Sequence, residues 1–136
     1  MRRYKSWAIY ATEVILDNRT TYMAKFTSAS DGTGEASVVK VDVSALTVPC
    51  HFVKIDEIVY STFGVGVAIE WAATTNVLAW MLPANSSGHL NFKHSGTPLV
   101  NTKAAGYDGD IAFTVTAALA SAGHGYSIIL ICTKTL

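Results

Sequence analysis

The chain has 136 residues, which is enough for one domain and too few for two independent hydrophobic cores. Ten basic and ten acidic side chains cancel in the formal net charge, so the chain lacks the positive field that attracts nucleic acids or anionic membranes. Charged residues make up 15% and hydrophobic residues 50% of the chain, which excludes intrinsic disorder and predicts a surface rich in Thr, Ser, Ala and Gly.

The chain shows neither a membrane segment nor a cysteine framework. Its longest apolar runs, such as residues 128–132, are far shorter than the roughly 18 residues that a membrane-spanning helix needs. The basic start of the chain is not followed by an apolar segment, so we expect no secretory signal and synthesis in the cytoplasm. Cys50 and Cys132 lack metal-ligand spacing, and the simplest interpretation is two small buried residues, with one disulfide as the alternative.

Short runs rich in Val, Ile and Thr alternate with turn residues along the whole chain. These three residue types make up 37 of the 136 residues, a composition typical of strands. Nine strands are predicted, at residues 12–16, 20–27, 37–43, 53–60, 65–71, 77–82, 89–92, 111–116 and 126–133. The Ala-rich stretch at 117–122 is too short for a stable isolated helix, so we expect a loop or a single turn there.

The periodicity of these strands predicts how they pack. Large side chains alternate at 65–71, which places Trp71 on a core face, and the same pattern puts Trp80 on one face with Leu78 and Leu82. Apolar residues occupy both faces of 126–133, which indicates a central strand. With turn signals every 8 to 12 residues, we expect an all-β fold: an antiparallel two-sheet sandwich, jelly-roll-like, with a closed barrel as the less favoured alternative. We expect residues 1–11 to form an N-terminal arm or edge segment and residues 12–136 to form a single β-sandwich domain.

No pattern of residues predicts catalysis, a cofactor or a metal. The four histidines are scattered, and His89 and His94 would face opposite sides of an extended strand. The carboxylates at 31–35 and 108–110 suit Ca²⁺ in their chemistry but do not match a calcium loop, so turns are the simpler interpretation. Asp56 and Glu57 would point to opposite faces of a strand, and no nucleophile has a nearby His and an orienting acid. We therefore expect no enzyme.

The N-terminal segment combines positive charge with aromatic residues. Arg2, Arg3, Lys5 and Arg19 are balanced only by Glu13 and Asp17. Aromatic and cationic anchors are enriched at protein interfaces, although a solvated chain end has the same composition. The candidate partner-binding residues are Arg2, Arg3, Tyr4, Lys5, Trp7 and Tyr10.

The order of several segments resembles the small all-β virion proteins of tailed bacteriophages. The resemblance covers about residues 12–134 and is carried by residues 30–35 leading into 38–44, then by 55–62, 69–71, 82–84 and 109–111. It implies a capsid decoration or cement protein that bridges major capsid subunits on the virion surface, with a homo-oligomer, a trimer by preference, and no nucleic-acid or membrane partner. A minor tail or neck protein and a carbohydrate-binding β-sandwich module are the alternatives.

Overall fold

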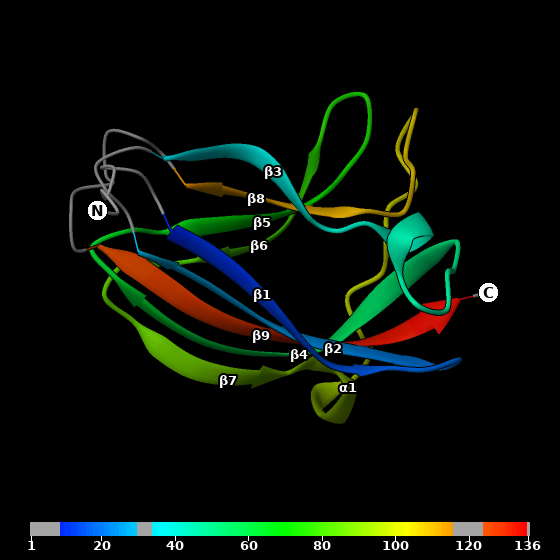
Figure 1. Ribbon diagram of the computed structural model, residues 1–136, viewed down its shortest axis with the longest axis horizontal. Helices are drawn as coiled ribbons and strands as arrows, with labels where there is room; N and C mark the ends of the chain where they lie inside the picture. Colours follow the sequence, from blue (N-terminus) through cyan, green and yellow to red (C-terminus); the bar gives the residue numbers. More distant parts are fainter. Residues whose placement is uncertain (1–8, 30–33, 116–123, 136) are drawn as a thin grey trace, which may run out of the picture.

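The computed structural model describes residues 9–29, 34–115 and 124–135, which form nine strands and two short helical turns (Figure 1). The strands are β1 (Ile9–Asp17), β2 (Thr21–Ala29), β3 (Glu35–Val41), β4 (Phe52–Phe63), β5 (Val67–Trp71), β6 (Val77–Leu82), β7 (Ser87–Asn91), β8 (Ile111–Val115) and β9 (Gly125–Thr135). The turns are a 3₁₀ turn, η1 (Val43–Ala45), and one α-helical turn, α1 (Phe92–Ser95).

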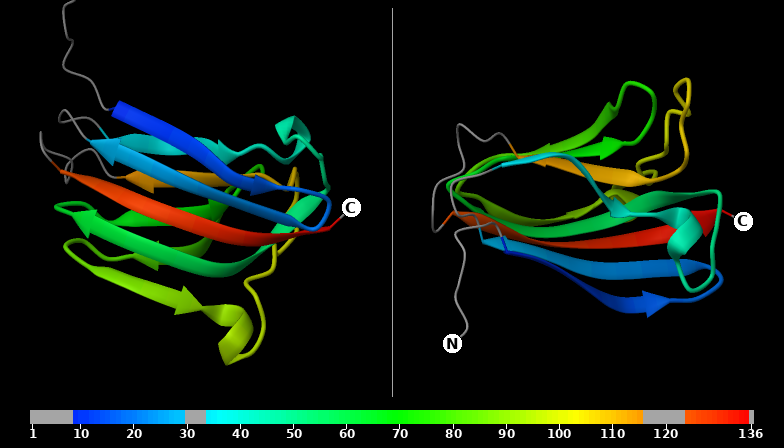
Figure 2. Two further views of the ribbon diagram at one scale, coloured as in Figure 1. Left: turned by 60° about the horizontal axis from the view of Figure 1, so that its bottom comes forward. Right: turned by 45° about the horizontal axis from the view of Figure 1, so that its top comes forward.

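The strands form two antiparallel sheets, which lie face to face in Figure 2. The larger sheet has the order β1-β2-β9-β4-β7 and the smaller has the order β3-β8-β5-β6. From β2 onward the strands pair in a nested order, as the two arms of one long hairpin do. β2 pairs with β9, β3 with β8, β4 with β7 and β5 with β6. This nesting defines a jelly roll, to which β1 adds one edge strand beside β2.

Most of the sequence predictions about the fold are confirmed. The structure is an all-β two-sheet sandwich with nine strands near the predicted positions, and β9 lies between β2 and β4. Two local predictions are wrong because a turn or a bulge interrupts the strand. The expectation that His89 and His94 would face opposite sides of one extended strand is wrong, because β7 ends at Asn91 and His94 lies in α1. The predicted turn at 117–122 lies outside the described residues.

Trp80 and Leu78 lie on opposite faces of β6, which corrects the prediction that they share one. The register of β6 against β5 shifts between Trp80 and Leu78, so that Ile69 faces Trp80 while the next residue, Glu70, faces Leu78. The extra residue, Ala79, is a bulge that reverses the alternation of the strand. Trp80 thus turns toward the core side and packs edge-on against Phe92, with 4.9 Å between ring centroids.

The core fills the space between the two sheets. Phe113 of β8 lies at its centre and makes edge-to-face contacts with Phe26 and Tyr126 of the opposite sheet at centroid distances of 5.5 and 5.8 Å. At one end, buried Glu35 accepts hydrogen bonds from the Tyr126 hydroxyl (2.9 Å) and from Lys40 (3.3 Å). The carboxylate therefore links the two sheets without being left unpaired, as burial of a charge requires.

Both cysteines are free, as the simpler interpretation of the sequence predicted. Cys132 is completely buried in β9, and Cys50 is partly buried against the core. Burial raises the pKa of both thiols, which keeps them in the neutral form. They behave as small apolar residues of the sandwich.

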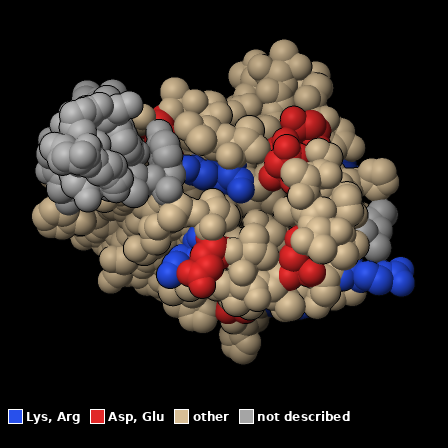
Figure 3. All heavy atoms as spheres, in the orientation of Figure 1, with Lys and Arg blue, Asp and Glu red and all other residues tan. Residues whose placement is uncertain are grey.

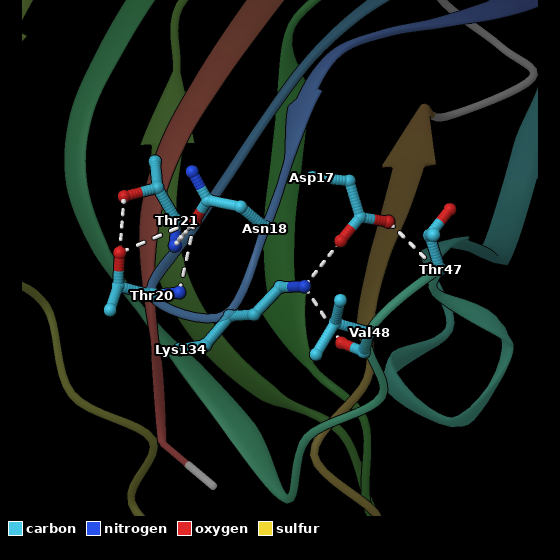
Figure 4. A network of polar contacts seen from close by, with 7 residues as sticks. All are labelled: Asp17, Asn18, Thr20, Thr21, Thr47, Val48 and Lys134. Atoms are coloured by element: carbon cyan, nitrogen blue, oxygen red, sulfur yellow. Dashed lines mark hydrogen bonds and ion pairs between the residues drawn. The ribbon is translucent and has the colours of Figure 1, made fainter.

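A buried lysine closes the other end of the sandwich (Figure 4). The Lys134 ammonium, from the end of β9, donates hydrogen bonds to Asp17 at the end of β1 and to the Val48 carbonyl (2.7 Å). Asp17 also accepts from the Thr47 N–H at 2.8 Å. Burial opposes the charge of Asp17, but the bonds and charge of Lys134 together with the Thr47 N–H outweigh it, so the pKa of Asp17 is lowered. Three separate segments of the chain meet at this ion pair.

Candidate interaction surfaces

The predicted partner-binding residues of the N-terminus fall largely outside the described part of the chain. Arg2, Arg3, Tyr4, Lys5 and Trp7 precede it, and Tyr10 is described only as backbone within β1. In the described ranges, no group of three His, Cys, Asp or Glu side chains is placed to hold a metal ion. The same ranges contain no helix long and apolar enough to cross a membrane.

The outer face of the smaller sheet carries three large exposed apolar side chains. Val39, Leu78 and Met81 point outward from its two edge strands and are 49%, 53% and 53% exposed. Cross-strand pairing puts Ala112 and Glu70 in the row between Val39 and Leu78 and puts Ala68 beside Met81, so the middle of the face has small side chains and one carboxylate. We give the name outer apolar face to Val39, Ala68, Leu78, Met81 and Ala112. Its large exposed side chains are apolar, a character typical of protein–protein interfaces.

Glu70 is the only acidic residue on the outward side of β5, and its charge is held in place. One carboxylate oxygen accepts hydrogen bonds from Thr114 (2.9 Å), Ser37 (3.4 Å) and Asn76 (3.4 Å). Strands β5, β6 and β8 contain no Lys or Arg. The face thus presents one carboxylate that is held by three polar side chains, rather than a set of groups able to move protons.

The outer face of the larger sheet has a different character, because charged pairs interrupt its apolar residues. Lys25 pairs with Glu13 at 3.0 Å, and His89 lies 2.6 Å from Glu57. Val59 between these pairs is 36% exposed. Burying exposed ion pairs of this kind removes their hydration, so this face is less suited than the outer apolar face to a contact that excludes water.

A groove opens along the free edge of the sandwich, where the edge strands of the two sheets lie. Val14 of β1 faces the buried Ala24 and so points toward the core side, yet it is 52% exposed. Among the described strands, none of the smaller sheet therefore covers β1 at this point. The resulting hollow has a volume of about 250 Å³ and is lined by Val14, Tyr22, Leu46, Lys40, Asp42 and Thr47. We call it the edge groove.

Three carboxylates gather in the loops beside the edge groove. Asp42 caps η1 by accepting from the Ser44 N–H at 3.1 Å, while Asp110 accepts from the Val43 N–H at 2.9 Å. Burial raises the pKa of Asp110 to about 6 against the effect of the Val43 hydrogen bond, and the charges of Asp108 and Asp42 add to the increase. In the described part of the chain, no ion pair neutralises these three groups.

Shallow hollows flank one exposed aromatic ring at the far end of β4. Phe63 is 63% exposed and contacts His124 edge-on, with 5.5 Å between ring centroids. The hollows on its two sides share Ser61 and are lined mainly by hydroxyl groups and one amide, Asn85. This arrangement places an exposed aromatic ring beside polar groups.

No protein-family model matches the sequence, and no curated protein matches it either.

Proposed function

We propose that this protein is a non-enzymatic structural protein of a bacteriophage virion, of the capsid decoration or cement type, which binds and stabilises the shell of major capsid proteins. The proposal starts from the resemblance of the sequence to small all-β virion proteins. The observation that carries it is the outer apolar face, which presents three large apolar side chains, each about half exposed, on one four-stranded sheet. Apolar side chains that stay in water do not stabilise a monomer. Their burial against a partner surface stabilises the complex through the hydrophobic effect.

The charge distribution also supports binding to a capsid shell, where many copies pack side by side. Most of the face drawn in Figure 3 is made of uncharged residues, and the formal charges of the chain cancel. Weak self-repulsion permits close packing of many copies. On a shell, contacts that are weak individually become strong because symmetry repeats them. The function is then mechanical: the sandwich bridges neighbouring capsid subunits and opposes their separation.

Binding to shells assembled without this protein tests the proposal. Purified protein should cosediment with such shells and raise their resistance to heat. Leu78→Lys places a charge in the outer apolar face and should reduce binding at least about tenfold, because it desolvates an ammonium at the contact. Val59→Lys, the matched control on the other sheet, should bind as wild type does. A protein that binds no shell, or shells whose heat resistance is unchanged by saturation, would refute the proposal.

The hollows around Phe63 favour one second candidate, a carbohydrate-binding module. Sugars stack their apolar faces on exposed aromatic rings and bond neutral polar groups, and both are present beside Phe63. Binding on a glycan array that is lost in Phe63→Ala and kept in Leu78→Lys would establish this function in place of the first.

A further inference from the structure

We propose that a row of hydroxyl groups on the outer face of the larger sheet binds an extended, uncharged polysaccharide, with the ring of Phe63 stacked on one of its sugars. The inference rests on the second candidate function, which it deepens by naming the class of glycan and the residues that hold it. It does not depend on binding to a capsid shell. It follows from the cross-strand register, from the hydrogen bonds that these hydroxyl groups leave unmade and from the uncharged lining of the hollows beside Phe63.

Four hydroxyl side chains form one cross-strand row over β2, β9, β4 and β7, which lie side by side in the larger sheet (Figure 1). The register pairs Ser127 of β9 with both Thr27 of β2 and Ser61 of β4, and it pairs Ser61 with Ser87 of β7. Side chains of paired residues lie on the same face of a sheet, and neighbouring strands are about 4.8 Å apart, so the row is about 14 Å long. We call these four residues the hydroxyl row.

The hydroxyl row faces solvent and its polar groups are unused. Ser61, Ser87 and Ser127 are exposed and Thr27 is half-buried. Within the described ranges, none of the four hydroxyl groups makes a hydrogen bond, whereas Thr62, which points inward from β4, donates to the Pro83 carbonyl at 2.6 Å. A hydroxyl group both donates and accepts, as the hydroxyl groups of a sugar do. An apolar partner would leave the row without hydrogen bonds, which costs free energy, and a glycan would satisfy it.

Phe63 supplies an apolar platform beside the row. It lies two residues beyond Ser61 in β4, so it is on the same face and about 7 Å away along the strand. Its cross-strand partner in β9 is Gly125, which has no side chain, and a hollow lined by both residues opens there. On another side, the His124 ring contacts Phe63 edge-on, and a Cβ at Gly64 would lie 2.2 Å from that His124 ring. Glycine at position 64 therefore lets His124 support a ring that is 63% exposed.

The lining of the hollows selects an uncharged ligand. The two hollows have volumes of about 220 and 330 Å³, and none of their lining residues is Asp, Glu, Lys or Arg. In the larger hollow, the amide oxygen of Asn85 accepts from the Gly64 N–H at 2.8 Å, which leaves the amide N–H groups of Asn85 to donate to a ligand. A glycan with carboxylate or sulfate groups would lose hydration here without gaining an ion pair from these lining residues.

The extent of the site favours a chain of sugars over a single sugar. Hollows flank Phe63 on two sides, and the hydroxyl row continues across four strands. One sugar on the Phe63 ring reaches only part of this surface. A longer chain that runs along the row, across the strands, adds hydrogen bonds that are weak individually and strong together.

A glycan array of neutral and acidic oligosaccharides, probed with the full chain, provides the first test. Neutral hexasaccharides should give signals that single sugars and oligosaccharides of uronic acids do not. The affinity for the neutral hexasaccharide with the strongest signal, measured by calorimetry, should change less than about twofold between 0.1 M and 0.5 M NaCl, because salt screens only charge interactions. Signals only for acidic glycans or single sugars would overturn this proposal alone. An array without any signal would overturn the second candidate function as well.

Serine variants separate the hydroxyl row from the aromatic ring. Ser61→Ala combined with Ser127→Ala should weaken binding of that hexasaccharide at least about tenfold, because two hydrogen bonds are lost, and should leave shell binding unchanged. The matched control is Ser95→Ala combined with Thr97→Ala, which removes two exposed hydroxyl groups away from the row and should bind as wild type does. Equal losses in the two double variants would refute the proposal. Binding that is lost in Phe63→Ala and unchanged in the variant of the row would also refute it, and would leave the second candidate function in place.

Discussion

Replacing Lys134 with Met breaks the buried ion pair at the end of the sandwich and should destabilise the protein strongly. The Lys134 side chain is 0% exposed and that of Asp17 is 7% exposed. Methionine has a similar length but no donor, so Asp17 keeps a buried negative charge and the Val48 carbonyl loses its lysine hydrogen bond. Breaking one partner of a buried pair costs about 3–5 kcal/mol of unfolding free energy. For a domain of this size, that loss lowers Tm by about 10–17 °C.

The pH dependence identifies the cause of the loss. The lowered pKa of Asp17 means that the pair stabilises wild type above the ordinary value of 3.8, and this contribution disappears as pH falls through the pKa of the folded state. In Lys134→Met the buried carboxylate lacks its cation, so protonation favours the folded variant. The difference in unfolding free energy between wild type and variant should therefore shrink as pH falls from 7 toward 3.

Urea denaturation followed by circular dichroism measures both effects. Lys25→Met is the control, because it removes an exposed lysine from its pair with Glu13 and should cost less than about 1 kcal/mol. Asp17→Asn combined with Lys134→Met should cost less than the sum of the two single changes. A loss in Lys134→Met no larger than that in Lys25→Met, or a loss that does not change with pH, would show that the pair does not hold this end together.

Three further predictions concern the loops and the core. Asp110→Asn should stabilise the protein at pH 7. Because the pKa of Asp110 is raised to about 6 in the folded protein, the unfolding free energy of wild type falls as pH rises from about 4 to 6. The variant lacks this carboxyl group and should not show that fall. The full shift corresponds to about 3 kcal/mol, and solvent screening of this partly exposed group reduces the expected gain to about 1 kcal/mol, measured by urea denaturation across that range. Gly109→Ala should cost about 2 kcal/mol or more in the same assay, because Gly109 has φ +90° and a Cβ there would overlap the His51 carbonyl oxygen; a variant as stable as wild type would contradict this. Cys132 should react with a thiol reagent only after unfolding, and labelling of both thiols at one rate in the native protein would show that its burial is incomplete.

The strands were predictable from the sequence because each depends on a local pattern. Alternation at 67–71 and 111–115 needs no knowledge of the partner strand, and the double-sided apolar run in β9 indicated its central position. The sandwich followed from the number of strands and the spacing of turns. No residue pattern fixed which strands pair, because pairing in a jelly roll joins segments far apart in the chain.

The candidate surfaces were not predictable, because each depends on an irregularity or an edge. The bulge at Ala79 decides that Leu78 points outward and Trp80 inward, and alternation alone gave the opposite result for Leu78. Val14 has the pattern of a core residue and is exposed only because β1 lies at an edge. Whether a strand lies at the edge of a sheet depends on the order of the assembled strands, so it is known only from the topology.

The position of β9 has a consequence for how the protein is made. Among the described strands β9 is synthesised last, yet it lies in the middle of the larger sheet and pairs with both β2 and β4. Until β9 is synthesised, β2 and β4 have no native neighbour on the sides that face it. Their unpaired edges and apolar side chains therefore stay exposed to solvent during synthesis. Folding that depends on such distant pairings is slow. A nascent chain that stops before β9 should therefore need chaperone protection rather than persist as a partly folded sandwich.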